Sequence, residues 1–404
     1  MKILVLEPHA IGHHGPYLEW MVNGLVERGF EVTVVTLPES IAHPTMQSLA
    51  DAAPTGGSKS LRLISFPAAG FPRTWSDGTA GFATRELSYW RLFKAWYKAQ
   101  AGTVRPDVVF LPYLDYCLYA IGLLGSPFGN CPWVGLAMRP SFHYRQMGVI
   151  APRPSLAAIK RALFFRLLNN RHLRSLLTID EPLATYLADR ARVSGKVAFF
   201  PEPTEFGELL DTSDAKRKLG VPADRNLILV YGAITRRKGV VELLRAVVDP
   251  ELPPSVDVLL AGKVSPEIHE LLVEPWVAKL VARGRIRLFD RFIETKEEPV
   301  LFAAADVVWL GYRGHYNASG ALVLAAAASC PVIACEEGII GWQTQRHGLG
   351  RTVNPEDMSE VAAAVGALLD YPPVKTENNG RADPWRPASF SEAQDALAHV
   401  LVGA

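Results

Sequence analysis

The sequence predicts an α/β protein built from two units, each with a parallel sheet covered by helices. The chain has 404 residues and is 49% hydrophobic, which is enough for two buried cores. Short apolar runs alternate with helical stretches along the chain, the pattern of parallel α/β folds. This alternation begins twice, at Lys2 and again near Leu227. We therefore expect two globular halves of similar architecture.

The first half opens with an apolar strand, Lys2–Leu6, a polar loop EPHAIGHHGPY, a helix that closes near residue 28 and a strand at 30–36. This β-loop-helix-β order is the Rossmann pattern, in which the first loop lies at the carboxyl edge of the sheet where ligands bind. The glycine fingerprint G-x-G-x-x-G does not occur here, which disfavours a nicotinamide or flavin dinucleotide. His13 and His14 in this loop are candidates for positioning or proton transfer. They would equally serve as a helix cap or lie in solvent.

The later strands predicted in the first half also end in polar residues. The strands at 107–111, 133–137, 176–179 and 197–200 are followed by Asp115, Arg139, Asp180 and Glu202 respectively. Because carboxyl ends of parallel strands meet at one edge, these side chains are expected to line one crevice. We interpret Asp180, with His13 and His14, as a catalytic candidate, and Asp115, Arg139 and Glu202 as candidates for acceptor binding.

Residues 154–177 carry basic side chains among leucines and phenylalanines and predict a long helix. A basic helix of this kind permits peripheral membrane contact, but its charges do not gather on one face, so a solvated surface helix is the simpler interpretation. The prolines near 201–203 are a plausible hinge. We place a first domain at 1–203, a second at 204–370, and a C-terminal segment, 371–404, that returns to the first.

The second half has a glycine-bounded basic loop, GAITRRKG at 232–239, between a strand at 227–231 and a helix that begins at Val240. Arg236, Arg237 and Lys238 would suit a phosphate at this strand-to-helix turn. A solvated run of charges is the alternative.

A second anion site is predicted within residues 307–341. An apolar strand at 307–312 leads through polar residues to Ser319, a favourable N-cap, and Gly320, which lets a ligand approach the backbone. The helix that follows is almost wholly apolar, so its free N–H groups and positive dipole end should point from a buried helix toward a crevice. An ordinary helix cap is the alternative. Two such loops in one unit together direct phosphate ligands to one crevice.

Composition narrows the class of protein. The formal net charge is +1, which disfavours a nucleic-acid partner. The four cysteines lie in apolar runs without metal-like spacing, and the N-terminus has no signal-peptide pattern. We expect a reduced, cytoplasmic protein with possible peripheral contact at the inner membrane face, and no obligatory metal, since no D-x-D pair occurs.

These residues resemble the family of retaining GT-B glycosyltransferases, whose two Rossmann-like domains face each other across a cleft. The family segment G-R-L-x-x-x-K-G matches residues 232–239 in spacing, which makes Lys238 similar to the lysine that binds the donor diphosphate. Ala233 replaces the family's arginine, and Arg236 or Arg237 could supply that charge. The segment E-G-F-G-L-V-x-x-E-A-M-A-x-G-x-P-V-I-A aligns on 316–334, where the two glutamates fall on Tyr316 and Leu324.

The resemblance implies sugar transfer from a nucleoside diphosphate sugar, such as a UDP-sugar, to an acceptor hydroxyl, with anomeric retention. The nucleotide sugar is a co-substrate, and no other cofactor is expected. The acceptor would be a sugar, a lipid-linked molecule or a small metabolite, in glycan, polysaccharide, glycolipid or metabolite synthesis. The donor's sugar or nucleoside would contact residues at the two later loops: His315, Tyr316, Asn317, Glu336 and Glu337. Two alternatives are a non-catalytic binding subunit of the same fold and another enzyme on this fold, either a nucleotide-sugar epimerase or a glycogen-type phosphorylase.

Overall fold

A computed structural model describes residues 1–12, 14–51, 60–66, 79–188, 190, 193–248, 252–370 and 387–403. The chain divides into two compact units. The first comprises Met1–Met147, Pro152–Pro201 and Ser389–Ala404, and the second comprises Gly148–Ala151 and Glu202–Ala388. The division near residue 201 lies close to the boundary expected after 203, and the last helix belongs to the first unit.

The first unit is built on a seven-stranded parallel sheet with the order β3-β2-β1-β4-β5-β6-β7. The strands form because apolar runs can be buried on both faces of a parallel sheet, and the inner strands have almost no exposed residue. Their bounds are β1 (Lys2–Leu6), β2 (Glu31–Thr36), β3 (Leu61–Ser65), β4 (Val108–Leu111), β5 (Trp133–Ala137), β6 (Leu173–Thr178) and β7 (Val197–Phe199).

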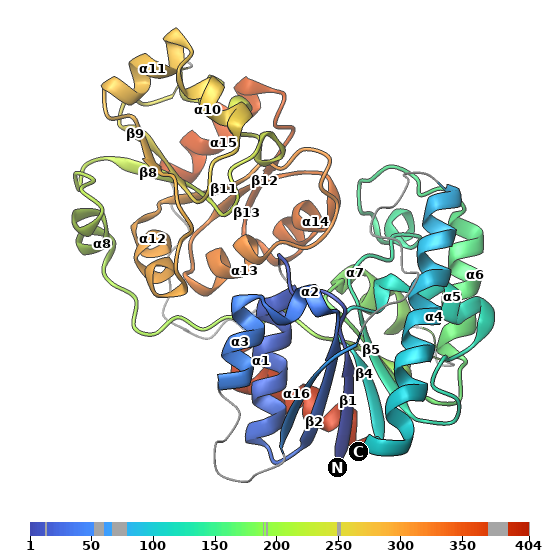
Figure 1. Ribbon diagram of the computed structural model, residues 1–404. Helices are drawn as coiled ribbons and strands as arrows, with labels where there is room; N and C mark the ends of the chain where they lie inside the picture. The colour runs from blue at the N-terminus through green and yellow to red at the C-terminus, as the bar shows by residue number, and fades with distance from the viewer. Residues whose placement is uncertain are drawn as a thin grey trace, which may run out of the picture. The chain divides into compact units, whose positions relative to one another are not determined.

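Helices cover both faces of this sheet (Figure 1). The helices α1, α3 and α16 lie on one face, and α4, α5 and α6 lie on the other. The bounds are α1 (His14–Glu27), α2 (Pro38–Ile41), α3 (Pro44–Asp51), α4 (Thr79–Val104), α5 (Leu118–Leu124), α6 (Ala157–Leu168), α7 (Glu181–Ala188) and α16 (Phe390–Val402). Arg28, just beyond α1, donates to the Asp395 carboxylate of α16 at 2.7 Å.

The helix predicted at 154–177 is wrong in its second half, and the strand predicted at 176–179 is present but begins earlier, at Leu173. The helix α6 ends at Leu168, and the chain then enters β6. Leu176 pairs in register with Gly135 of β5 and with Val197 of β7, so residues 173–178 form an inner strand. Pairing on both sides and burial of Leu173, Leu176 and Leu177 outweigh the local helical preference of leucine.

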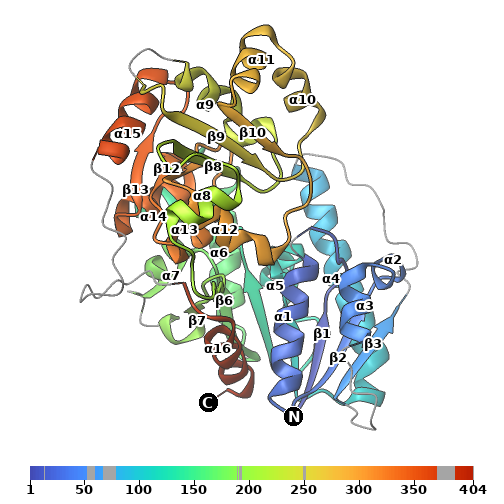
Figure 2. The same cartoon turned by 90° about the vertical axis from the view of Figure 1, so that its left-hand side faces the viewer.

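The second unit contains a six-stranded parallel sheet with the order β10-β9-β8-β11-β12-β13. One apolar core holds residues of α9, α10, α11 and α15, and a second holds residues of α8, α12, α13 and α14, so the sheet is covered on both faces (Figure 2). The strands are β8 (Asn226–Tyr231), β9 (Val256–Ala261), β10 (Ile286–Phe289), β11 (Val307–Leu310), β12 (Val332–Cys335) and β13 (Gly350–Val353). The helices are α8 (Thr212–Lys218), α9 (Val240–Val247), α10 (Pro266–Leu272), α11 (Pro275–Ala282), α12 (Glu298–Ala304), α13 (Gly320–Ala327), α14 (Gly338–His347) and α15 (Met358–Asp370).

Each sheet has one point at which the strand order reverses. In the first sheet this point lies between β1 and β4, where Ile3 pairs with Val108. In the second it lies between β8 and β11, where Val307 pairs with Ile228. Loops that leave neighbouring strands at such a point diverge to opposite faces and leave a crevice at the carboxyl edge. The loops singled out in the sequence follow these strands.

None of the helices in the described ranges is long and apolar enough to cross a membrane.

Candidate functional site

Lys238 is the last residue of a short helical turn, η4 (Arg236–Lys238), that follows β8. Its side chain is only 8% exposed, and its Nζ donates to the carbonyl oxygen of Tyr231 and to the hydroxyl of Tyr312, each at 2.6 Å. The buried Trp309 donates from its indole nitrogen to the Lys238 carbonyl oxygen at 2.8 Å. An ammonium group has three N–H donors, so these contacts leave one for a ligand.

A polar pocket of about 580 Å³ lies beside this turn, at the carboxyl edge of the second sheet. It brings together four of the predicted donor-site residues, Arg236, Arg237, Glu336 and Glu337. Its other lining residues are Arg313, Gly314, Cys335, Asn354, Pro355 and Glu356. The volume falls within the range of sites that hold a small molecule. Clustered guanidinium groups are suited to binding phosphate oxygens through paired hydrogen bonds.

Arg313 is a lining residue that the sequence analysis did not single out. Its backbone N–H donates to the carbonyl oxygen of Arg237 at 2.8 Å, which joins the loop after β11 to the loop after β8. Its guanidinium forms salt bridges with Glu242 of α9, at 2.7 Å, and with Glu356. Its place in the loop that follows a buried strand could have indicated it, because the same place in the chain identified His315, Tyr316 and Asn317 as candidates.

The beginning of α13 carries the other predicted phosphate contacts. Ser319 is the N-cap residue, but its side chain does not accept from the helix; its Oγ lies 3.4 Å from the hydroxyl of Tyr312. Tyr312 therefore lies between Lys238 and Ser319. The His315 ring contacts the Tyr312 ring, with centroids 5.5 Å apart. Asn317 lies in the same loop, between His315 and α13 in the sequence. The predicted residues of the two loops thus converge around Tyr312, an aromatic residue that was overlooked.

Glu202 was expected in the first unit, but it belongs to the second. A Cβ atom added to Gly320 would lie 3.0 Å from the Glu202 Oε1, so this carboxylate lies directly against the first residue of α13. The residue follows Pro201, where the chain passes from the first unit to the second, which is why its position after a strand was misleading. A carboxylate at the N-terminal end of a helix interacts favourably with the helix dipole.

The loops after β11 and β12 pack closely against each other. Gly338, with φ of +77°, begins α14, and an added Cβ there would lie 2.7 Å from the Cα of Tyr316 and 2.9 Å from the His315 carbonyl oxygen. The Ile339 N–H donates to the Tyr316 carbonyl oxygen at 3.1 Å. Burial, followed by the nearby Glu337 carboxylate, raises the pKa of the Tyr316 phenol. This contact places Tyr316 beside Glu337, as members of one site.

In the first unit, His14 lies in a cluster at the reversal point between β1 and β4. Its Nδ1 is 3.6 Å from the Oε1 of Glu7 and 3.3 Å from the hydroxyl of Tyr116, which itself donates to Glu7 at 3.0 Å. The His14 ring also contacts Tyr113, with centroids 4.6 Å apart. Tyr116 lies between the imidazole and the buried Glu7 carboxylate, an arrangement that suits general acid–base chemistry. Glu7 was missed, although it follows β1 directly.

His9 belongs to the same cluster. Its Nε2 lies 2.7 Å from the hydroxyl of Tyr89, and its backbone N–H donates to Glu7 at 3.1 Å. Burial lowers the pKa of His9, and the Glu7 carboxylate opposes that shift. A neutral imidazole at this position is therefore favoured at neutral pH.

Asp115 and Arg139 lie at the same edge. The two carboxylate oxygens of Asp115 accept from the backbone N–H groups of Met138, at 2.7 Å, and Arg139, at 3.0 Å. Burial raises the pKa of Asp115 to about 6, although these hydrogen bonds act in the opposite direction. The exposed Arg139 guanidinium lies 5.6 Å from the centroid of the Tyr113 ring. Tyr113 thus connects Arg139 with His14.

Asp180 has a different environment. It is completely buried, it lies 3.2 Å from the Nε2 of His143, and its Oδ1 accepts from the backbone of Leu183 at 2.8 Å, which caps α7. A carboxylate closed off from solvent and engaged in capping does not support the predicted catalytic role. His13, the other predicted catalytic residue, lies outside the described residues.

Within the described parts of the chain, His, Cys, Asp and Glu side chains do not form any group of three or more that could hold a metal ion.

Two all-parallel Rossmann-like units, each with polar residues gathered where the strand order reverses, define a fold of the GT-B type. The model of the family described as "Glycosyl transferases group 1" matches residues 225–371, which include the polar pocket and Lys238. A search of curated proteins finds no sequence match to this chain.

Similar solved structures extend over nearly the whole chain. Sucrose-phosphate synthase from Thermosynechococcus elongatus has a TM-score of 0.61 at 19% identity, covering 99% of this chain and 94% of that one. The Anabaena protein HepE, solved in complex with UDP, has a TM-score of 0.61 at 16% identity, covering 99% and 95%. UDP-GlcNAc 2-epimerase from Neisseria meningitidis, bound to UDP-GlcNAc, has a TM-score of 0.61 at 10% identity, covering all of both chains. The predicted GT-B fold class, with two Rossmann-like domains, is confirmed.

Proposed function

We propose that this protein is a glycosyltransferase that moves a sugar from a nucleoside diphosphate sugar to an acceptor hydroxyl. The observation that carries the proposal is the arginine-lined pocket beside Lys238, which lies inside the region matched by the group 1 glycosyltransferase family. Structures of the same fold contain UDP or a UDP-sugar, which favours a UDP-sugar donor. The product would belong to glycan, glycolipid or glycosylated-metabolite synthesis.

Negative charge develops on the diphosphate as the glycosidic bond breaks. Cations and N–H donors that are already in place stabilise this charge, because they need not reorganise during the reaction. Arg236, Arg237 and Arg313 would bind phosphate oxygens, and Lys238 would contribute its remaining N–H. Glu336 or Glu337 would accept from ribose hydroxyls, and His315 or Asn317 from the sugar. His14, Asp115 and Arg139 are proposed to bind or activate the acceptor.

We further propose that transfer retains the anomeric configuration and requires no metal, with arginine side chains providing the positive charge. NMR of the product anomer tests the first point. Comparison of rates with EDTA and with added Mg²⁺ or Mn²⁺ tests the second.

A thermal-shift panel of UDP, GDP, ADP and TDP tests the donor site, since a ligand that binds only the folded state raises the melting temperature. The variants are Lys238→Ala and the exposed Arg237→Ala, with Arg217→Ala, an exposed arginine on α8, as the matched control. We expect one nucleotide to stabilise wild type and the control, and both site variants to lose that shift. No stabilisation by any nucleotide at millimolar concentration contradicts the proposal and favours a non-catalytic subunit.

The epimerase alternative is separated by an activity assay without acceptor. Conversion or hydrolysis of UDP-GlcNAc in the absence of any acceptor hydroxyl would indicate the epimerase reaction. Sugar transfer that depends on an added acceptor would support the glycosyltransferase.

A further inference from the structure

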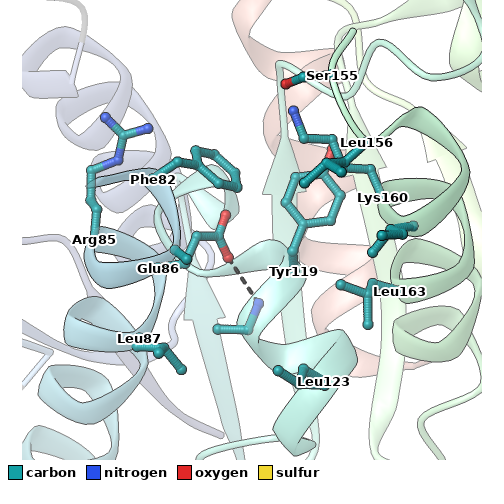
Figure 3. Close-up of a pocket in the computed structure, with 13 residues that line it drawn as sticks. Phe82, Arg85, Glu86, Leu87, Tyr119, Leu123, Ser155, Leu156, Lys160 and Leu163 are labelled. Carbon is teal, nitrogen blue, oxygen red and sulfur yellow. Dashed lines mark hydrogen bonds between the residues drawn. The ribbon is translucent and has the colours of Figure 1, made fainter. Parts of the chain in front are cut away.

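A second pocket, of about 440 Å³, lies in the first unit between α4, α5 and α6 (Figure 3). Its walls are largely apolar and include Phe82, Tyr119, Leu123, Leu156, Ile159 and Leu163. Side chains of Leu123, Leu156 and Ile159 are each at least half exposed, although apolar side chains of this size are normally buried. Leu156 also adopts a left-handed backbone conformation, with φ of +58°, which is costly for a residue other than glycine.

A buried carboxyl group, that of Glu86, projects into this apolar space. Glu86 of α4 is 4% exposed, and its Oε2 accepts from the Ala120 N–H at the start of α5, at 2.8 Å. Its Oε1 is buried and has no hydrogen-bond partner among the described residues. Figure 3 shows the Glu86 carboxyl group between Phe82 and Tyr119. A buried polar atom without a partner is destabilising, and a ligand atom could satisfy it.

Positive charge stands on either side of the Phe82 ring. The Nζ of Lys160 lies 5.0 Å from its centroid, and the guanidinium carbon of Arg85 lies 5.4 Å from it. Neither forms a salt bridge with any residue that the structure describes. Lys160 extends from α6 across Tyr119, with 5.9 Å between its Nζ and that ring's centroid. The pocket thus combines an apolar interior with one cation, Lys160, beside Tyr119, while Arg85 lies on the other side of the Phe82 ring.

The state of Glu86 matters for the charge of the pocket. Burial raises its pKa to about 8, against the weaker lowering effect of the Ala120 hydrogen bond. At neutral pH the carboxyl group is therefore mostly protonated, and it can donate a hydrogen bond to an oxygen atom. Lys160 and Arg85 are then the charged groups of the pocket wall.

We propose that this pocket binds a single-chain amphiphile with an anionic head group, its hydrocarbon chain between α4, α5 and α6 and its head beside Lys160. The oxygen atoms at the junction of chain and head would reach the Oε1 of Glu86. The volume of about 440 Å³ suits one small ligand. This site is independent of the proposed nucleotide pocket, because it is built wholly from residues of the first unit.

Titration calorimetry of the full chain with decyl phosphate, below its critical micelle concentration, tests the proposal. Decanol and decyltrimethylammonium provide neutral and cationic heads on the same chain, and inorganic phosphate provides the head without the chain. We expect decyl phosphate to bind at least tenfold more tightly than either control amphiphile, since a charge-assisted hydrogen bond contributes about that factor. Phosphate alone should not bind at this pocket.

Matched variants locate the site. Ile159→Glu should abolish binding of decyl phosphate, and Lys160→Gln should weaken it about tenfold while leaving decanol unchanged. Two controls are at exposed positions of the second unit: Val273→Glu matches Ile159→Glu, and Lys279→Gln matches Lys160→Gln. Both controls should leave binding of decyl phosphate unchanged. Glu86→Gln keeps a hydrogen-bond donor and should bind as wild type, whereas Glu86→Met should bind several-fold more weakly.

The nucleotide panel is repeated on Ile159→Glu, and an unchanged nucleotide shift shows that the variant is folded. The proposal is overturned if decyl phosphate does not bind, if the cationic amphiphile binds equally well, or if Ile159→Glu binds like wild type. Binding to anionic phosphatidylglycerol vesicles without binding of the monomeric amphiphile would also overturn it, in favour of contact with a membrane surface. If wild type binds decyl phosphate but none of the nucleotides, only the glycosyltransferase proposal is contradicted.

Discussion

The Nζ of Lys238 lies 2.6 Å from the phenolic oxygen of Tyr312 and 4.5 Å from the centroid of its ring. The two residues belong to different loops, one after β8 and the other after β11, on either side of the point where the strand order reverses. Tyr312 therefore holds the lysine both by a hydrogen bond and by a cation–π contact. A cation fixed in this way stabilises developing charge better than a mobile one.

Tyr312→Phe should weaken nucleotide binding about three- to tenfold, with a loss of stability of about 1 kcal/mol, because it removes one hydrogen bond from Lys238 and keeps the ring. Titration of the nucleotide found in the thermal-shift panel measures the effect. Tyr97→Phe in the first unit is the control and should bind as wild type. Equal affinities in the two variants would show that Tyr312 does not position the lysine.

Gly239→Ala should destabilise the second unit by about 3 kcal/mol or more. Gly239 has φ of +66°, and an added Cβ would overlap the carbonyl oxygen of Gly311. Gly348→Ala is the matched control, with φ of +63° and open space around the added atom, and should cost only the roughly 1–2 kcal/mol of backbone strain. Chemical denaturation compares the two variants. A smaller loss in Gly239→Ala than in Gly348→Ala would contradict the close approach of the two loops.

Glu202→Gln should strengthen nucleotide diphosphate binding several-fold. The Glu202 carboxylate lies against Gly320 at the start of α13, where it would repel a phosphate, and glutamine removes the charge at nearly constant size. Titration at low and high salt provides the measurement, since the gain should shrink as salt screens the charge. Weaker binding by the variant would mean that the carboxylate contacts the ligand directly through a hydrogen-bond donor of the ligand.

The free energy of unfolding should fall as pH rises through the window set by Glu86. The folded pKa is about 8, against an ordinary value of 4.5, so between these values the folded protein keeps a proton that the unfolded chain has lost. Stability then decreases with rising pH, by about 4 kcal/mol between about pH 5 and about pH 9. The charged or titratable groups near Glu86 are Arg85 on α4, Lys160 on α6, and Asp115, Cys117 and Tyr119 around α5.

Denaturation curves of wild type and Glu86→Gln across this range isolate the contribution of Glu86. Glutamine cannot ionise, so the variant should lose this part of the pH dependence and gain stability relative to wild type at high pH. Parallel curves for the two proteins would mean that Glu86 is ionised in the folded state at neutral pH.

Local sequence patterns predicted most of the fold, because the buried strands are continuous apolar runs and the helices between them have clear ends. The segment at residues 173–178 was predicted both as the end of a helix and, from 176, as a strand. A leucine-rich segment suits either structure, and pairing with β5 and β7 decides for the strand. Glu202 shows the same limit, because its distance from a strand in sequence does not reveal which unit holds its side chain.

The sequence by itself determined the parallel α/β class, the two-unit organisation and the loops that carry Lys238, Arg236 and Ser319, since these follow from hydrophobic periodicity and from glycine and charge at strand ends. Only the tertiary structure decided that Tyr312 joins Lys238 to Ser319, that Tyr116 connects His14 with Glu7, and that Glu86 projects into an apolar pocket. These relationships join residues far apart in the chain. Their geometry depends on strand order and on the packing of neighbouring loops, which spacing along a single chain does not specify.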